Sequence, residues 1–304
     1  MAGLKAIKTK IRSVEKTRKV TKAMEAVSAA KMRKAQQKAI AGRAYAKAAV
    51  SILSRVSGSR ELMSHPLVKA NEGTSALYIV ITSDKGLAGA LNSAVLRAAA
   101  ADIHANGLSE KQISVIAIGK KANDFFSIRG YTIERFYPNT DEVTTGLLSS
   151  VLEEAAASYT AGKVSRVSII YQNFISTFEQ RPTMRTIFPL SLEELQKVVG
   201  DIVPAKGVFS QPHAEENPSI YTIEPSDTEV LNAILPKLAG IFVYHALLES
   251  QASEHSARMV SMKSASDKAG EMRHSLTLKF NKARQAAITR EVSEITGGME
   301  AMTA

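Results

Sequence analysis

Cysteine and tryptophan are absent from this 304-residue chain. Without cysteine the chain can form no disulfide, no thiolate metal site and no cysteine nucleophile. Its six histidines include no HExxH pattern and no pair four residues apart, and no GxSxG elbow occurs, so neither a zinc hydrolase nor a serine hydrolase is indicated. We therefore expect no catalytic residue, no bound metal and no cofactor.

Long apolar runs are lacking as well. The longest candidate, ILPKLAGIFVYHALL, is interrupted by Pro236, Lys237 and His245, and it falls short of the roughly 20 apolar residues that span a membrane. The basic N-terminus, MAGLKAIKTKIRSVEK, lacks the continuous apolar core and the cleavage site of a signal peptide. We expect a chain with no transmembrane segment.

Acidic residues are scarce in residues 1–56, which carry 15 Lys and Arg against only Glu15 and Glu25, a net charge of +13. The remainder has 24 basic and 27 acidic residues, a net charge of −3. This uneven charge predicts an acidic partner for one element. Tyr45 is the only aromatic residue there, which favours an acidic protein surface over nucleic acid. A scaffold that binds nucleic acid or an anionic membrane through this segment stays an alternative.

Residues 4–56 also lack proline and contain one glycine, Gly42, which predicts a single long helix. Alternate steps of three and four residues follow a seam that is apolar at both ends of this helix. The seam positions are Leu4, Ile7, Ile11, Val14, Arg18, Thr21, Glu25, Ser28, Met32, Ala35, Ala39, Gly42, Ala46, Ala49, Leu53 and Val56. In the middle the apolar side chains shift to Val20, Met24 and Val27, which predicts a stripe that drifts toward a different partner.

A second long helix is predicted to begin near Ser226, which has capping-box spacing to Glu229. We expect Pro236 to kink this helix or to split off a short first piece. Its seam runs through Ile241, His245, Leu248, Ala252, His255, Met259, Met262, Ser266, Ala269, Arg273, Leu276, Phe280, Ala283 and Ala287. The apolar stripe then steps forward to Ile288, Val292, Ile295 and Met299. Gly297 and Gly298 are expected to stop or fray the helix.

Each long helix has a seam that needs a partner, and the simplest partner is the other helix. Residues 1–57 and 226–304 are therefore predicted to form an antiparallel coiled coil, with residues 75–225 as a separate domain. In the middle, β-rich runs alternate with helical ones, which predicts a mainly parallel sheet in a Rossmann-like α/β domain. The expected strands are 76–81, 113–118, 131–136, 164–171 and 184–188, and the expected helices are 91–104 and 143–159.

The stretch SDKGLAGALN follows the first expected strand and places Gly86 and Gly89 at GxxG spacing. It has neither the GxGxxG fingerprint nor the Walker pattern, and Asp102 and Glu110, about 20 residues on, lie in polar stretches. A structural turn is therefore favoured over a phosphate site. A nucleotide-binding Rossmann enzyme with coiled-coil extensions stays an alternative.

Four stretches together resemble, in order, the gamma subunit of F-type ATP synthases. They are IRSVEKTRKVTKAMEAVSAAKMRKAQ, SDKGLAGALN, ALLESQASEHSARMVSMKSASDKAGEM and NKARQAAITREVSEITGG. The C-terminal run Ile288, Thr289, Glu291, Glu294 and Gly298 follows the spacing of the family's signature. Met299 departs from it, since the family usually has alanine there.

The resemblance implies a coiled coil with a Rossmann-like domain that binds no nucleotide. It also implies a non-catalytic rotor shaft that stands inside a ring of alpha and beta subunits, rests on the c-ring and binds the epsilon subunit. The residues expected to meet the beta subunits are Met24, Lys31, Arg33, Lys34, Arg284 and Gln285. Ile288, Val292, Ile295 and Met299 would form an apolar tip in the bearing of the ring.

At the other end, YTIEPSD resembles the segment that meets the c-ring, with Tyr221 and Glu224 as the contact residues. Plant chloroplast members carry a regulatory cysteine pair, which this chain lacks. A bacterial source is therefore expected, with the chain peripheral to the inner membrane on its cytoplasmic side. A mitochondrial form on the matrix side is the alternative.

Overall fold

The computed structural model describes residues 2–42, 60–191, 193 and 226–303. The chain divides into two compact units, one made of Met1–Ala29 with Arg258–Ala304 and the other of Ala30–Ala257. We call the first the helix-pair unit and the second the α/β unit. The predicted boundaries at residues 57 and 225 lie outside the described residues, so the domain limits stay predictions.

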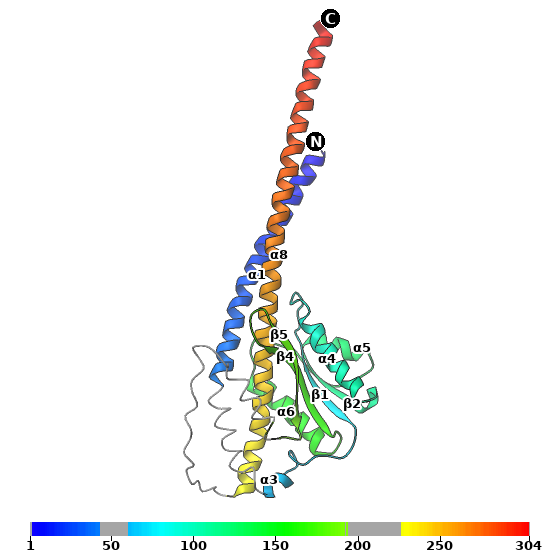
Figure 1. Cartoon of the computed structure of the whole chain (residues 1–304), viewed down its shortest axis with the longest axis vertical. Helices are drawn as coiled ribbons and strands as arrows, with labels where there is room; N and C mark the ends of the chain where they lie inside the picture. The colour runs from blue at the N-terminus through cyan, green and yellow to red at the C-terminus, as the bar shows by residue number, and fades with distance from the viewer. Residues whose placement is uncertain (1, 43–59, 192, 194–225, 304) are drawn as a thin grey trace. The chain divides into compact units, whose positions relative to one another are not determined.

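Two long helices contribute to both units (Figure 1). They are α1, Ala2–Ala41, and α8, Asp227–Thr303. The remaining helical elements lie in the α/β unit: α3 Arg60–Ser64, α4 Leu91–Ala105, the 3-10 turn η1 Glu110–Gln112, α5 Lys120–Ile128 and α6 Thr145–Thr160. Its strands are β1 Ala76–Ile81, β2 Ile113–Ile118, β3 Thr132–Tyr137, β4 Arg166–Phe174 and β5 Gln180–Phe188.

The strands form one sheet in the order β3-β2-β1-β4-β5, and the prediction of a mainly parallel sheet is confirmed. β1 pairs in parallel with both neighbours, with Ala76 opposite Ile113 on one side and Arg166 on the other. β5 runs antiparallel to β4, from Val167 opposite Phe188 to Phe174 opposite Gln180. The central strand β1 is buried along its whole length, as expected for a strand covered on both faces.

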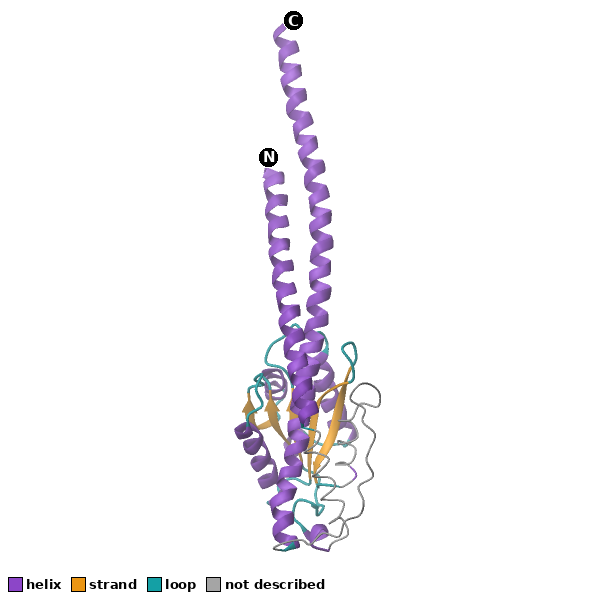
Figure 2. Ribbon diagram, turned by 90° about the vertical axis from the view of Figure 1, so that its left-hand side faces the viewer, coloured by secondary structure: helices purple, strands orange, loops and turns teal. Residues whose placement is uncertain are grey.

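Alternate residues of the sheet enter two cores, so helices cover both faces (Figure 2). Tyr78 and Val80 of β1 pack with Val95 and Phe126 from α4 and α5. On the other face, Ile79 joins a larger core. That core takes in Val151, Ala155 and Tyr159 of α6 and Leu231, Leu235, Leu238 and Phe242 of α8.

The first part of α8 owes its apolar character to this second core. Within Thr228–Met299 one 18-residue window has a mean hydropathy of 1.5, which is apolar and long enough for a membrane span, and 56% of that window is buried inside the protein. Core helices pass the same test by composition, because an all-round apolar helix suits a protein interior as well as a bilayer. Packing on the sheet accounts for the run.

Several predictions about α8 are corrected by its course. The Ser226 hydroxyl does accept the Glu229 amide (3.3 Å), as the predicted cap requires. Pro236, however, does not split the helix, and Gly297 and Gly298 do not end it, since α8 runs through all three to Thr303. A proline removes one backbone hydrogen bond of the helix, and a glycine lowers helix stability by about 1 kcal/mol. A long helix tolerates both when the residues on either side are helical.

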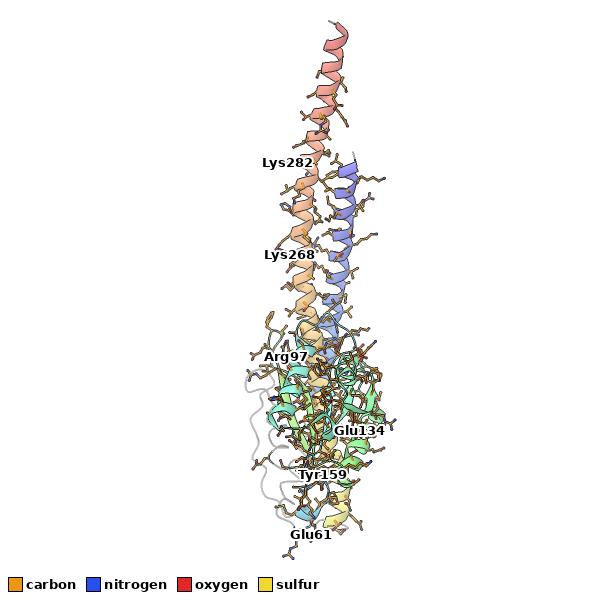
Figure 3. The ribbon with its side chains drawn as sticks, turned by 90° about the vertical axis from the view of Figure 1, so that its right-hand side faces the viewer. Glu61, Arg97, Glu134, Tyr159, Lys268 and Lys282 are labelled. Atoms are coloured by element: carbon orange, nitrogen blue, oxygen red, sulfur yellow. The ribbon has the colours of Figure 1, made fainter. Side chains whose placement is uncertain are left out.

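In the helix-pair unit, α1 and α8 lie side by side and antiparallel (Figure 3, where Lys268 and Lys282 are labelled on α8). Arg273 Nη1 donates to Glu15 Oε2 (2.9 Å). A Cβ added to Gly270 would lie 3.7 Å from Arg18, so later residues of α1 meet earlier residues of α8. The predicted antiparallel coiled coil is confirmed in this unit.

The predicted seam of α1 is buried or half-buried at every described position from Leu4 to Gly42. Val20 and Val27 are 58% and 55% exposed while Thr21 and Ser28 are buried, as expected for an apolar stripe that drifts away from the partner helix. That this stripe faces a different partner stays a prediction. In this stretch the residues that face α8 are set by the seam spacing and not by their hydrophobicity. Small polar side chains at these positions let the two helices approach closely. Residues 43–56 of the predicted helix lie outside the described residues.

Candidate interaction surfaces

The turn after β1, SDKGLAGALN, is held by its own side chains. The Ser83 amide donates to Asn92 Oδ1 (2.9 Å), and Asn92 Nδ2 donates to Ser83 Oγ (2.8 Å). Leu87 and Gly89 have positive φ angles of 66° and 58°, so the chain reverses tightly before α4. The turn thus bonds strand to helix within the protein, as a structural turn does.

The N-terminus of α5 beside it is also capped from within. Thr82 Oγ1 accepts the Ala122 amide (2.8 Å), and Asp84 Oδ1 accepts the Lys120 amide (2.8 Å). These donors are the groups that would meet a phosphate at a helix N-terminus. Because a carboxylate and a hydroxyl already accept these amides, few free donors are left for a phosphate at this edge of the sheet.

Asp102 has the sequence separation from the glycines at which a Rossmann site places its ribose ligand, but its carboxylate binds other side chains of the protein. Its Oδ2 accepts the Tyr78 hydroxyl (2.6 Å) and lies 3.0 Å from Arg166 Nη2. Burial, followed by the bond to Asp102, raises the pKa of Tyr78 well above its usual value. Tyr78 therefore stays a neutral donor, and the cluster joins α4 to β1 and β4. Among the described residues no group of three or more His, Asp or Glu is arranged to hold a metal.

Lys31, in the basic part of α1, has its charge engaged within the α/β unit. Lys31 Nζ donates to Asp141 Oδ2 in the loop between β3 and α6. His255 Nε2 of α8 lies 3.3 Å from Asp141 Oδ1. Burial raises the pKa of Asp141, but the hydrogen bond and charge of Lys31, with His255 and Lys85, outweigh it and lower the pKa below its usual value. Asp141 is therefore a carboxylate that joins three elements.

The end of α8 presents a continuous surface in the helix-pair unit. α8 continues past the N-terminal end of α1 (Figure 1). Leu276, Phe280, Ala283 and Ala287 are half-buried at seam positions, and the described side chains after Ala287 are all exposed. Ile288, Val292, Ile295 and Met299 are 51–65% exposed and recur on one face of the helix.

Comparison with known proteins identifies the chain. The ATP synthase family model matches residues 3–302. The ATP synthase gamma chain of Heliobacterium modesticaldum is 38% identical over 306 residues, which cover 99% of this chain and 100% of the relative. That of Staphylococcus saprophyticus is 35% identical over 303 residues, with 99% and 100% covered. The chain belongs to the ATP synthase gamma chain family.

Solved structures of low identity share the fold. A chain in the Euglena gracilis mitochondrial ATP synthase structure, OSCP/F1/c-ring, superposes with a TM-score of 0.65 at 21% identity, covering 99% of this chain and 95% of that one. A chain in the central stalk/c-ring structure from Tetrahymena thermophila gives a TM-score of 0.60 at 22% identity, covering 81% and 99%. The predicted fold class, an α/β domain with long terminal helices, is thus confirmed.

The residues of this gamma chain that were predicted to meet partners fall into three groups. Arg33, Lys34, Arg284 and Gln285 are exposed, and Met24 is half-buried. Lys31 is half-buried, with its amine on Asp141. Tyr221 and Glu224 lie outside the described residues. Asp141 was not predicted, because it lies in a loop after β3 that no motif marks.

Proposed function

We propose that this gamma chain is the central rotor shaft of an F-type ATP synthase. In this role it transmits rotation of the c-ring to the catalytic beta subunits during proton-driven ATP synthesis, and transmits it in reverse during hydrolysis. The observation that carries the proposal is the antiparallel pair of α1 and α8. Both helices lie within residues 3–302 almost completely, and the ATP synthase family model matches these residues. A paired helix resists bending and twisting better than a single one, as a shaft must.

The two long helices would face the ring of catalytic subunits. Arg33, Lys34, Arg284 and Gln285 would contact the beta subunits, as would the half-buried Met24. Lys31 would contribute less to this contact, because its amine is bonded to Asp141. A shaft that differs in charge and apolarity around its circumference presents each of the beta subunits with a different surface. This asymmetry would be the signal that drives the subunits through their states in turn.

Two further parts of the chain take different partners in this proposal. The apolar stripe of Ile288, Val292, Ile295 and Met299 would sit in the bearing of the alpha and beta ring, where burial of this exposed surface favours assembly. Tyr221 and Glu224 would meet the c-ring, and the α/β unit would bind the epsilon subunit. The complex would lie on a bacterial inner membrane, with the chain peripheral on its cytoplasmic side, and a mitochondrial matrix location is the alternative.

The chain itself would be non-catalytic. Support comes from the turn after β1 and the start of α5, where Asn92, Thr82 and Asp84 bind the donors that a nucleotide would use. These contacts disfavour the alternative of a nucleotide-binding enzyme with coiled-coil extensions. Saturable binding of ATP or NAD to the full chain at micromolar concentration would revive that alternative.

The proposal is tested by mixing the chain with alpha and beta subunits and Mg-ATP. We expect native mass measurement to find one copy per six-membered ring, and steady ATP hydrolysis to require the chain. A negative control is the chain lacking residues 258–304, which removes the whole α8 part of the helix-pair unit. Stable hydrolysis without the chain, or no capture of the intact chain, would contradict the proposal.

A further inference from the structure

One stretch of α8 is enclosed within the α/β unit. Residues 250–256 are all buried, and six of the seven are polar, Ala252 being the exception. A helix that only covers a sheet keeps one polar face in water. This stretch therefore has neighbours on every side, and its polar side chains need partners from each of them.

On one side the partner is the hairpin between β4 and β5. Three side chains of α8 bond to backbone atoms of the hairpin. Glu249 Oε2 accepts the Phe174 amide (3.0 Å), Ser253 Oγ donates to the Gln172 carbonyl (3.0 Å), and Ser256 Oγ donates to the Thr177 carbonyl (2.7 Å). Ser253 and Ser256 have no exposed surface, so water does not compete for their bonds.

On another side the partner is the loop between β3 and α6. Gln251 Nε2 donates to the Thr140 carbonyl (2.8 Å), and His255 Nε2 lies 3.3 Å from Asp141 Oδ1. The other oxygen of Asp141 accepts Lys31 Nζ, so the loop also holds α1. One short loop thus ties both long helices to the sheet.

The two sets of contacts hold nearly opposite faces of α8. At about 100° per residue, Glu249, Ser253 and Ser256 lie within about 60° of one another on the helix. Gln251 and His255 project roughly 150° away from that group. We call the hairpin contacts and the loop contacts together the collar.

A collar of this kind opposes rotation of the helix about its own axis. An apolar contact is non-directional and lets a helix slip by a few degrees at little cost. Hydrogen bonds weaken steeply when their geometry is lost, and bonds on opposite faces resist turning in either sense. Aliphatic side chains would bury this stretch equally well, so the polar ones add orientation rather than burial.

We propose that the collar locks α8 against turning inside the α/β unit, and that Asp141 is the positioning residue that extends this lock to α1. The inference rests on the proposed function, since it assigns the collar the task of passing torque from the foot of the rotor into the helix pair. Without the collar, part of each rotation step is lost as twist between the sheet and the helices.

The test measures torsional stiffness in the assembled complex. Because the chain has no cysteine, an Ile128→Cys substitution at the exposed end of α5 gives one labelling site on the α/β unit. The alpha and beta ring is immobilised and stalled with Mg-ADP, and the angular fluctuation of a probe attached to the introduced thiol is recorded. We expect the variant Asp141→Asn, Ser253→Ala, Ser256→Ala to raise the angular variance at least two-fold.

Glu154→Gln is the matched control, because it breaks the Arg135–Glu154 ion pair (3.2 Å) in the same unit and leaves the collar intact. Its variance is expected to equal that of the parent, and all variants are expected to hydrolyse ATP at the parental rate. Unchanged variance in the collar variant would overturn the inference. Should that variant fail to assemble, the angular variance is measured with Asp141→Asn alone. This single substitution is expected to raise the variance, and Asp141→Glu is expected to keep it near the parental value. Failure of the parent to enter the ring would instead refute the proposed function.

Discussion

At the scale of single residues, the backbone at Gly119 depends on having no side chain. Its φ angle is 97°, and a Cβ there would lie 2.0 Å from the Thr82 carbonyl oxygen. This close approach lets Thr82 cap α5 from the adjacent strand, where it accepts the Ala122 amide. The glycine is therefore required by contact as well as by conformation.

Gly119→Ala is expected to destabilise the chain by at least about 2 kcal/mol, since it adds both backbone strain and a steric clash. Urea denaturation followed by circular dichroism measures the change. Gly146→Ala is the matched control, because nothing lies within 4 Å of an added Cβ in α6 and the change favours helix. Equal stability of the two variants would show that the turn relaxes without cost.

The Asp141 carboxylate predicts a specific acid sensitivity. Its pKa is below the usual value because Lys31, His255 and Lys85 outweigh the effect of burial. A group with a depressed folded pKa adds stability above its unfolded pKa of about 4, and this stability is lost as pH falls through the folded pKa. Asp141→Asn should therefore lower the thermal midpoint at pH 7 and lower it by less at pH 3. An equal loss at both pH values would count against the ion pairs as its source.

At the scale of elements, neighbouring residues of α1 differ in burial according to whether they lie on the helix seam. Ser28 is buried at a seam position, whereas Val27 is 55% exposed. We expect Val27→Ser to change stability by less than about 0.5 kcal/mol, and Ser28→Leu to cost about 1–3 kcal/mol through overpacking between close helices. Thermal unfolding of the two variants measures both. A larger loss for Val27→Ser would place the drifting apolar stripe, and not the seam, against α8.

The basic face of α1 provides a test of the contact with beta. Arg33→Glu with Lys34→Glu is expected to slow ATP hydrolysis of the assembled complex several-fold, because both side chains are exposed and reversal turns attraction into repulsion. Lys31 is left unchanged, since its reversal would break the bond to Asp141. Lys111→Glu with Lys163→Glu, exposed on the α/β unit, is the control for net charge. An unchanged rate of ATP hydrolysis at low salt would show that the basic face is only a solvated surface and does not contact beta.

Most elements were predictable from the sequence because their signals are local. The apolar runs of β1 and β2 were predicted with their observed limits, since buried parallel strands are continuously apolar. The nine-residue α5, KKANDFFSI, was missed because it is short and begins with polar residues. The helical course through Gly297 was missed because a glycine only weakens a helix, and its neighbours decide the outcome.

The candidate surfaces were predictable only in part. Motif resemblance singled out Arg284, Gln285 and the apolar tip, and the structure places all of them on the surface. The bond between Lys31 and Asp141 was not foreseen, because it joins residues 110 positions apart. Long-range pairs of this kind depend on the loop geometry at the end of a sheet, which has no local pattern in a single sequence.

At the scale of the whole molecule, the tip of α8 tests the assignment as a shaft. Ile288, Val292, Ile295 and Met299 leave an apolar stripe exposed beyond the seam that ends at Ala287. An exposed stripe of this kind has no reason to persist in a chain that works alone, because it favours aggregation. Deletion of residues 288–304 should therefore weaken capture by the alpha and beta ring and leave the α/β unit folded. Native mass measurement and thermal unfolding report the two effects separately.

Truncation also shortens the helix, so the stripe itself needs a substitution that keeps the length. Changing its four apolar residues to serine should reproduce most of the loss of capture, since about 25 cal/mol per Å² of buried apolar surface would be forfeited. Arg290→Ser with Glu294→Ser alters exposed charged positions of the same segment and is expected to assemble normally. If the charged pair mattered more than the stripe, the bearing would be electrostatic. If neither change mattered and the truncated chain assembled and coupled normally, the tip would have no bearing role, and the shaft would be held by the seam region alone.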